Sequence, residues 1–345
     1  MLFREIFNYI GIVKSTTSDE VECSDKDLKD FYLSQSQKTD FVERMLDSVN
    51  ASLKTDPTIE RPMALLKSFV SDFPDRNEEG EYVAIDLGGS FYKIYLIKLK
   101  KQSLPDIDYE SIKIPNEIMV SSGATFFDFL AGKVKEFMVK KGVSGKELSV
   151  GITFSFPCDV KSINSSIILG WTKNFIVADT IGKDVSVMFE EALKKKGLKL
   201  KIKTVVNDSI ATLAAGKLQH SNCSIAVIVG TGFNISYVQN ATTFQRKDLR
   251  DVSAESLILN AECGNYGRFD ELKDIITPYD SKLNATSQNI GQQRLEKMIS
   301  GLYLGELMRI LLLELCQKGR LFSAHVPPCL NAHGVFLTKY VVEIA

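Results

Sequence analysis

The chain has 345 residues, of which 44% are hydrophobic and 25% charged, so it is long and apolar enough to build two domains with sizeable cores. Its formal net charge of −1 excludes a general attraction to nucleic acid or to acidic membranes, since both require a basic excess. The most apolar helical stretch, 310–315, is too short to span a membrane and contains a charge. We therefore expect neither nucleic-acid binding nor membrane insertion.

The six cysteines show no CxxC pairing and the three histidines lack metal-site spacing, so no metal site is predicted. The N-terminal stretch carries charge among its apolar residues and lacks a clean cleavage site of small residues, which argues against a signal peptide. We interpret the cysteines as free thiols of a cytoplasmic protein.

The first 62 residues are mostly polar and have a helical pattern. Apolar residues recur at helical spacing over 40–53, and Pro57 and Pro62 mark the end of this pattern. We expect residues 1–62 to form a helical lead-in that packs on the larger domain and is not a domain of its own.

A strand pattern over 82–85 leads into a glycine-rich turn, Asp86-Leu87-Gly88-Gly89-Ser90, and a second strand over 91–97 leaves it. This arrangement predicts a β-hairpin with a glycine-rich tip. The elements expected next are a helix over 126–140, a strand over 148–154, a loop with Trp171-Thr172-Lys173, and a helix over 185–196.

Asp208 lies between an apolar strand and the helix-like stretch 210–216. A carboxylate at such a junction can bond backbone amides as a helix N-cap, or it can project into a cleft and accept a proton from a substrate hydroxyl. The residue alone does not decide between these two roles.

A second unit of strand, glycine turn and strand follows Asp208: strand 225–229, the turn Gly230-Thr231-Gly232, and strand 234–238. Glycine turns after apolar strands bring backbone amides close to phosphate oxygens. Two similar α/β halves that face each other across a cleft, each with one such turn, have a geometry that clamps a nucleotide. The pattern therefore suggests a phosphoryl transferase.

Neither common nucleotide motif is present: no GxxxxGK[ST] string occurs, and the third glycine of GxGxxG would fall on Ile235. From about Leu66 onward the chain instead resembles the hexokinase family of sugar kinases, which has the actin-like ATPase fold. The blocks that carry the resemblance occur in the family's order: Ala84-Ile85-Asp86-Leu87-Gly88-Gly89, Thr153-Phe154-Ser155-Phe156-Pro157, Trp171-Thr172-Lys173, Val206-Asn207-Asp208, Ile228-Val229-Gly230-Thr231-Gly232, Asn260-Ala261-Glu262, and the stretch 291–301.

The resemblance implies an α/β chain of two domains, with a sugar and ATP cleft between a small domain over 63–205 and a large domain over 206–345. It implies transfer of the γ-phosphoryl group of MgATP to the 6-hydroxyl of glucose or a related hexose, the first step of glycolysis. A sugar hydroxyl is a weak nucleophile, so a carboxylate must take its proton. By resemblance this base is Asp208.

The resemblance also assigns the other site residues. The implied sugar contacts are Ser155, Thr172, Lys173, Asn207, Asp208, Asn234, Glu262, Gln293 and Glu296. Lys173 is also expected to stabilise charge on the transferred group. The implied ATP contacts are Asp86, Gly88, Gly89, Ser90, Lys93, Gly230, Thr231 and Gly232, with Asp86 orienting the hydrated Mg²⁺.

Several of these residues also have simpler interpretations. Asp208 alone would be taken as an N-cap, and Glu262 and Glu296 as solvated surface acids. Asn260, two residues before Glu262, points to the same side of the chain and favours the pocket for Glu262. The Gln292-Gln293 pair favours the pocket for Glu296. We expect Trp171 to be a core side chain.

The chain departs from the family pattern mainly near the nucleotide. Phe91 and Lys93 stand where the family has Asn and Arg, and lysine lacks the planar fork of arginine for phosphate. Phe233, Cys263 and Ile290 are further departures. The sugar site is therefore better kept than the ATP site.

The segment 334–340 matches a family segment that is normally followed by adenosine-binding residues and a C-terminal helix. The resemblance thus implies that these are absent from the 345-residue chain, which weakens ATP binding and domain closure. The alternative function is a catalytically weak or inactive hexose-binding regulator. A nonfunctional fragment is a third reading.

Overall fold

The computed structural model describes residues 29–54, 60–71, 73, 77–89, 91–250, 254–321 and 325–344. Five strands form the sheet of one lobe: β2 (Gly80–Leu87), β3 (Phe91–Leu99), β4 (Asp106–Lys113), β5 (Leu148–Phe154) and β8 (Leu200–Val206). Their order is β4-β3-β2-β5-β8. Strand β2 pairs antiparallel with β3 and parallel with β5. The strand that leads into the first glycine turn therefore lies at the centre of its sheet.

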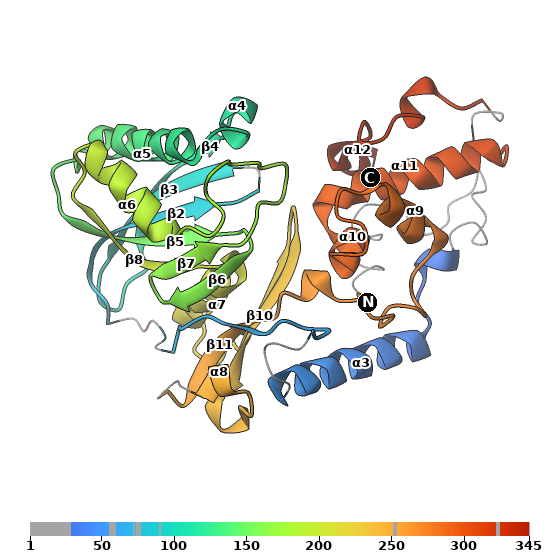
Figure 1. Ribbon diagram of the computed structural model, residues 1–345, viewed down its shortest axis with the longest axis horizontal. Coiled ribbons are helices and arrows are strands. Elements are labelled where there is room, and N and C mark those ends of the chain that lie inside the picture. The colour runs from blue at the N-terminus through green and yellow to red at the C-terminus, as the bar shows by residue number, and fades with distance from the viewer. Residues whose placement is uncertain are drawn as a thin grey trace.

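Helices α5 (Gly123–Lys140) and α6 (Val185–Lys195) cover one face of this sheet (Figure 1). The hydroxyl of Ser122 caps α5 by accepting a hydrogen bond from the backbone N–H of Thr125, and Asp184 caps α6 in the same way through Ser186. The shorter elements of this lobe are α4 (Asn116–Met119) and the hairpin of β6 (Cys158–Ser162) and β7 (Ser165–Ile168).

The second lobe has a four-stranded antiparallel sheet of β1 (Leu66–Lys67), β9 (Ile225–Val229), β10 (Phe233–Asn240) and β11 (Ser256–Asn260), in the order β1-β11-β10-β9. Helix α7 (Asp208–Gln219) buries Ile210 and Leu213 against Ala226 and Ile258 of this sheet. This contact fixes the helix that begins at Asp208 to the second lobe.

The remaining helices belong to the second lobe and its surroundings: α3 (Gln35–Lys54), α8 (Lys247–Arg250), α9 (Pro278–Thr286), α10 (Arg294–Ile299), α11 (Gly301–Gln317) and α12 (Thr338–Ile344). Short 3₁₀ turns are η1 (Lys29–Phe31), η2 (Ala241–Thr243), η3 (Cys263–Asn265) and η5 (Pro328–Leu330). In Figure 1, helices α9 to α12 lie on the opposite side of β10 and β11 from the first lobe. Helix α3 packs on the core of the second lobe through Leu53.

The structure confirms the helices and strands expected from the sequence. The helix expected over 40–53 is α3, the two strand–turn–strand units are β2–β3 and β9–β10, and Trp171 packs among the rings of Phe126, Phe154, Phe156 and Phe175. Strand β4 and the hairpin β6–β7 were not expected. Residues 1–28 and 55–59 of the expected lead-in lie outside the described residues.

The domain limits inferred from the sequence, 1–62, 63–205 and 206–345, stay predictions. One contact bears on the first limit: Met63 and Leu65 are buried in the core of the second lobe, and β1 pairs with β11 of that lobe. This packing favours a start of the small domain nearer Gly80.

The described cysteines, Cys158, Cys223, Cys263, Cys316 and Cys329, are free thiols. Cys23 lies outside the described residues. None of the helices in the described part of the chain combines the length and apolar character that a membrane crossing requires.

Candidate active site

The strand-to-helix junction holds the candidate base. Asn207 is the N-cap of α7, and its Oδ1 accepts a hydrogen bond of 2.9 Å from the backbone N–H of Ser209. Asp208 follows at the first helical position, where its Oδ1 accepts from the same N–H at 2.8 Å. Among the described residues, no group donates to Oδ2 of Asp208. Because Asn207 occupies the cap position, one carboxylate oxygen of Asp208 stays open to a ligand.

A chain of amide side chains connects this junction to Glu262. Asn234 on β10 donates through Nδ2 to Oδ1 of Asn207 at 3.2 Å and to Oδ1 of Asn260 at 2.8 Å. Asn260, at the end of β11, donates through Nδ2 to Oε1 of Glu262 at 2.7 Å. The antiparallel register of β10 and β11 brings these strand residues together. Four polar side chains from three segments therefore share one network.

Gln293 and Glu296 reach the same region from α10. The carboxylate oxygen Oε2 of Glu296 accepts a hydrogen bond of 2.8 Å from the backbone N–H of Phe233. Gln293 has a φ of 51°, in the left-handed region, and its backbone N–H donates to Oδ1 of Asn265 at 2.9 Å. A Cβ on Gly264 would lie 3.0 Å from Oε1 of Gln293 and 3.2 Å from Oε2 of Glu296, so this glycine permits the approach of both side chains.

Lys173 joins the two lobes. Its backbone φ is 57°, and its Nζ donates to the carbonyl oxygen of Ser155 at 3.0 Å. A Cβ on Gly89 would lie 2.3 Å from Cδ of Lys173, and a Cβ on Gly232 would lie 3.7 Å from its Cε. The lysine side chain thus passes between both glycine turns; it requires the missing side chain of Gly89, whereas its distance to Gly232 is an ordinary contact.

The first glycine turn carries a carboxylate and a cation. Asp86 and Lys93 are paired across β2 and β3, with Nζ of Lys93 3.6 Å from Oδ2 of Asp86. The backbone N–H of Gly88 donates to the carbonyl oxygen of Phe91 at 3.2 Å and closes the turn. Ser90 lies outside the described residues.

The second glycine turn is built on the N-terminus of α11. Backbone N–H groups of Gly301 and Leu302 donate to the carbonyl oxygens of Gly230 and Thr231 at 2.8 and 3.1 Å. A Cβ on Gly232 would lie 2.7 Å from Oε2 of Glu296. The turn is therefore held by the helix on one side and leaves no room for a side chain on the other.

The electrostatics of the site are dominated by carboxylates. Burial raises the pKa of Glu262 and of Glu296, and the negative charge of Asp208 raises both further. Burial also raises the pKa of Asp86, against the opposing effect of Lys93. Lys173 lowers the pKa of all three groups. One lysine thus offsets several carboxylates, which leaves acceptors for the hydroxyl groups of a ligand.

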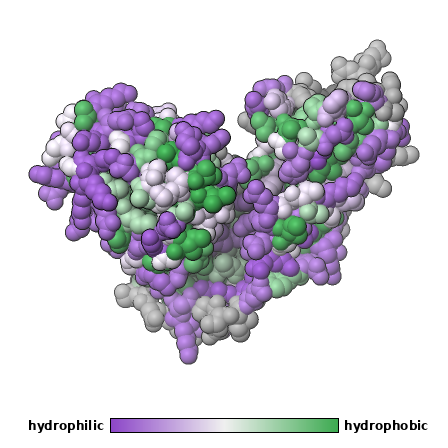
Figure 2. All heavy atoms as spheres, turned by 45° about the horizontal axis from the view of Figure 1, so that its top comes forward, coloured by the Kyte–Doolittle hydropathy of each residue, from purple (hydrophilic) through white to green (hydrophobic). Residues whose placement is uncertain are grey.

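The site lies between the lobes. Figure 2 shows the molecular surface hollowed between them. A cavity of about 30 Å³ beside the amide network is lined from the first lobe by Phe154, Phe156 and Cys158 and from the second by Asn207, Asn260 and Glu262. A ligand here would touch both lobes at once.

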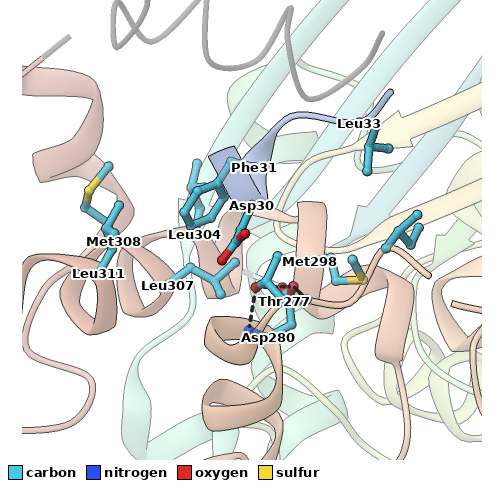
Figure 3. A pocket seen from close by; sticks show the side chains of 11 residues that line it. Asp30, Phe31, Leu33, Thr277, Asp280, Met298, Leu304, Leu307, Met308 and Leu311 are labelled. Carbon is cyan, nitrogen blue, oxygen red and sulfur yellow. Dashed lines mark hydrogen bonds between the residues drawn. The ribbon is translucent and has the colours of Figure 1, made fainter. Parts of the chain in front are cut away.

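A second hollow is separate from this site. Figure 3 shows it between η1 and helices α10 and α11, lined mainly by apolar side chains. Its polar members are Asp30, Thr277 and Asp280, of which Thr277 and Asp280 bond to each other as the capping box that begins α9. It shares no residue with the candidate site.

Apart from Thr172, the sequence-predicted site residues of the described chain lie in the amide network, around Lys173, at the start of α10 or in the two glycine turns. Thr172 precedes Lys173 on the loop anchored by Trp171, whose Nε1 donates to Oγ1 of Thr180 at 2.8 Å. The sequence-based assignment left out Asn260 as a site residue, although it bridges Asn234 and Glu262. Its signal was its position two residues before Glu262. In the described ranges, no group of three or more His, Cys, Asp or Glu residues could hold a metal ion.

Comparison of this chain with known proteins shows which proteins it is similar to. Two sequence models described as hexokinase match residues 24–218 and 224–345. Hexokinase-1 of Pongo abelii is 33% identical over 92% of this chain, and Hexokinase HKDC1 of Homo sapiens is 34% identical over 93% of it. The structure of a Schistosoma mansoni hexokinase complexed with glucose matches over 98% of this chain and 72% of its own, with 30% identity and a TM-score of 0.84.

This chain spans about a third of the length of the curated relatives it matches, 35% in the case of the Pongo abelii protein. A further solved hexokinase is 30% identical over 90% of this chain and 69% of its own, with a TM-score of 0.70. The two-lobed arrangement of this chain is therefore that of the hexokinase-type, actin-like ATPase fold.

Proposed function

Because this chain belongs to the hexokinase family, we propose that it transfers the γ-phosphoryl group of MgATP to the 6-hydroxyl of glucose or a related hexose. One observation carries this proposal: the open oxygen of Asp208 lies beside the network of Asn207, Asn234, Asn260 and Glu262. A polyhydroxyl ligand needs alternating donors and acceptors, and a reacting hydroxyl needs a base.

The residues divide the chemistry among themselves. Asp208 takes the proton of the attacking hydroxyl, which is worth ~10²–10⁴-fold in rate. Hydroxyl, amide and carboxylate side chains hold the other hydroxyls in place: Ser155, Thr172, Asn207, Asn234, Glu262, Gln293 and Glu296. Lys173, which lies between both glycine turns, faces the charge that develops on the transferred phosphoryl group. Closure of the lobes over the sugar excludes water from the phosphoryl group.

The glycine turns fit the phosphates of a nucleotide. The Cβ positions of Gly89 and Gly232 are taken by the side chains of Lys173 and Glu296, so glycine lets these groups approach the turns. In this proposal the backbone groups of Gly88, Gly89, Gly230, Thr231 and Gly232 bind the phosphate oxygens. Asp86 would hold the hydrated Mg²⁺ of MgATP, which when bound neutralises phosphate charge. Lys93 and the hydroxyl of Ser90 complete the proposed contacts. The free thiols of the described cysteines support a cytoplasmic setting.

A second candidate function is a catalytically weak hexose-binding regulator. Lys93 supports it, because this residue is already 3.6 Å from Asp86 and cannot contact phosphate as a bidentate group. In this case the sugar network would serve binding alone.

Two measurements on one sample separate these functions. Trp171 is the only tryptophan and lies beside Thr172 and Lys173, so its fluorescence should report a saturable titration with glucose. A coupled assay should then detect hexose 6-phosphate when MgATP is added. Saturable binding without product favours the regulator, and a folded chain that shows neither contradicts both proposals.

A further inference from the structure

A lysine is buried directly behind the candidate sugar contacts of α10. The side chain of Lys297 is 2% exposed. Its Nζ donates to Oδ1 of Asn284 at 2.9 Å and to the carbonyl oxygen of Asn289 at 2.8 Å. Within the described parts of the chain, no carboxylate lies within ion-pair distance of it. Lys297 thus holds a buried cation with neutral partners only.

The partners of Lys297 lie at the end of α9 and in the connection from α9 to α10. Asn284 lies in the last turns of α9, and its Oδ1 also accepts a hydrogen bond of 3.0 Å from the backbone N–H of Gly291. Asn289 lies within the connecting segment 287–293. The lysine, on α10, therefore fastens the middle of this segment directly and its later part through Asn284.

The segment ends at a residue of the candidate site. Gln293 closes it with a φ of 51°, and one helical turn further Glu296 bonds to the second glycine turn. Gln293 N–H is bonded to Asn265, so the segment is fixed at its end by η3 and in its middle by Lys297. The position of the segment decides where the Gln293 side chain points.

The cation is costly for the fold. Burial lowers the pKa of Lys297 from 10.5 to about 8, and the neighbouring Arg294 adds to the effect while Glu296 opposes it. An apolar side chain of similar length would avoid this cost, and buried ionic groups replaced in this way are often no loss to stability. The hydrogen bonds to Asn289 of the segment and to Asn284 of α9 are what a methionine could not supply.

We propose that Lys297 is a positioning residue for the hexose, which fixes segment 287–293 so that Gln293 and Glu296 face the sugar. This inference rests on the proposed hexose site. Lys297 itself does not touch the sugar: its effect passes through Asn284 and Asn289.

The test compares Lys297→Met with Lys282→Met in the full chain. Lys282 is an exposed lysine of α9 that bonds Glu314 and does not touch the segment, so it is a matched control. We expect Lys297→Met to weaken glucose binding about 10-fold or more, because small displacements of contact residues have large effects. ATP affinity should change less than about 2-fold. Lys282→Met should leave both affinities unchanged.

Two variants of Asn284 test the route of the effect. Asn284→Ala removes the acceptor shared by Lys297 and Gly291 and should weaken glucose binding, whereas Asn284→Asp keeps an acceptor oxygen and should retain most of it. Combining Asn284→Ala with Lys297→Met should cost less than the sum of the single effects, because both break one connection.

Amide hydrogen exchange provides a readout independent of sugar. Exchange over 287–293 should accelerate in Lys297→Met and not in Lys282→Met. A folded Lys297→Met that binds glucose like the unmodified chain overturns the inference, and so does an equal loss of glucose and ATP affinity with a lower melting temperature. If the unmodified chain binds no hexose, the proposed function fails, while exchange still decides whether Lys297 fixes the segment.

Discussion

The carboxylate of Glu296 accepts a hydrogen bond of 2.8 Å from the backbone N–H of Phe233 and so connects a candidate sugar contact to the second glycine turn. Phe233 directly follows this turn and is buried in the core of the second lobe, so it anchors the turn to that core. The two halves of the candidate site, one for sugar and one for phosphate, therefore meet at a single carboxylate.

Replacing Glu296 should disturb both halves of the site. We expect Glu296→Ala to weaken glucose binding strongly and MgATP binding more mildly, since the N–H of Phe233 loses its acceptor. Glu296→Gln keeps an acceptor oxygen for this N–H and should spare MgATP while it still weakens glucose. Calorimetric titration of each ligand separates the two effects. Equal responses of both variants to both ligands would argue against a shared role.

Removing the candidate base should affect turnover and spare binding. Asp208→Asn should lower kcat by ~10²–10⁴-fold with little change in the glucose dissociation constant, because the network of Asn207 and Asn234 stays in place. Stability should change little, since Asn207 is the N-cap of α7. Steady-state kinetics and a melting curve on the same sample test this. If melting temperature falls and turnover per folded molecule does not, Asp208 serves the helix and not the reaction.

The sequence predicted elements well where a local pattern exists. The hairpin of β2 and β3 and the later strand–turn–strand unit have alternating or continuous apolar strands that lead into glycines. In strand β4 the charged residues Asp106, Asp108 and Glu110 alternate with Ile107 and Tyr109, but the strand is exposed along most of its length and has no buried face, so its pairing with β3 is what makes it a strand. Such pairing is a tertiary effect that no local window contains.

The candidate site shows the same limit. Asp208 and the glycine turns stand out in sequence, but the role of Asn260 depends on the register that places β11 beside β10. Lys297 gives no signal at all, because a lysine on a short helix is usually solvated and its burial depends on the fold of α9. Motifs thus point to candidate contact residues more readily than to the residues that hold them in place.

The raised pKa values of Glu262 and Glu296 predict how glucose binding depends on pH. A carboxyl group whose pKa is raised by folding stabilises the fold at low pH, and this contribution is lost as the pH rises through the folded pKa. Glu262 and Glu296 are such groups in the free protein. Glucose hydroxyls donate to ionised carboxylates and should lower both pKa values, so binding releases protons in mild acid and weakens as the pH falls. Melting with and without glucose at pH 7 and in mild acid should show a smaller shift in acid.

A buried ion pair of α11 should control the stability of the C-terminal part of the second lobe. Arg309 forks onto Glu306 and donates to the carbonyl oxygen of Leu330 at 2.6 Å, while Glu306 accepts from the backbone N–H of Gly334. Burial alone would raise the pKa of Glu306, but these hydrogen bonds hold it below its ordinary value. The pair thus fastens the segment around 330–334 to the helix.

Replacing one partner of this ion pair should destabilise the fold much more than replacing both. Arg309→Met should lower the free energy of unfolding by about 3–5 kcal/mol, because it leaves Glu306 buried without its cation. Changing both Arg309 and Glu306 to methionine should recover most of the loss. Urea denaturation of the two proteins measures the difference. A double variant as unstable as the single one would mean that the backbone contacts at Leu330 and Gly334, and not the charges, matter.

Two neighbouring glycines of the first turn offer the sharpest test of Lys173. A Cβ on Gly89 would lie 2.3 Å from Cδ of Lys173, closer than side chains approach. Among the described residues, a Cβ on Gly88 would meet only the carbonyl oxygen of Phe91 at 3.5 Å, an ordinary contact. Gly89→Ala should therefore displace the lysine side chain, and Gly88→Ala should not. Both positions lie in the same turn, so each variant is the control of the other.

If Lys173 stabilises the transferred phosphoryl group, Gly89→Ala should lower kcat by roughly 10- to 100-fold, in the range of a lost electrostatic contact. Lys173→Met should lower it by at least as much, and adding Gly89→Ala to Lys173→Met should then cost little, because the lysine that the new methyl group displaces is already gone. Kinetics at saturating glucose and MgATP measure the three variants. Full additivity of the two changes would show that Gly89 acts on the phosphates directly and that its contact with Lys173 is incidental.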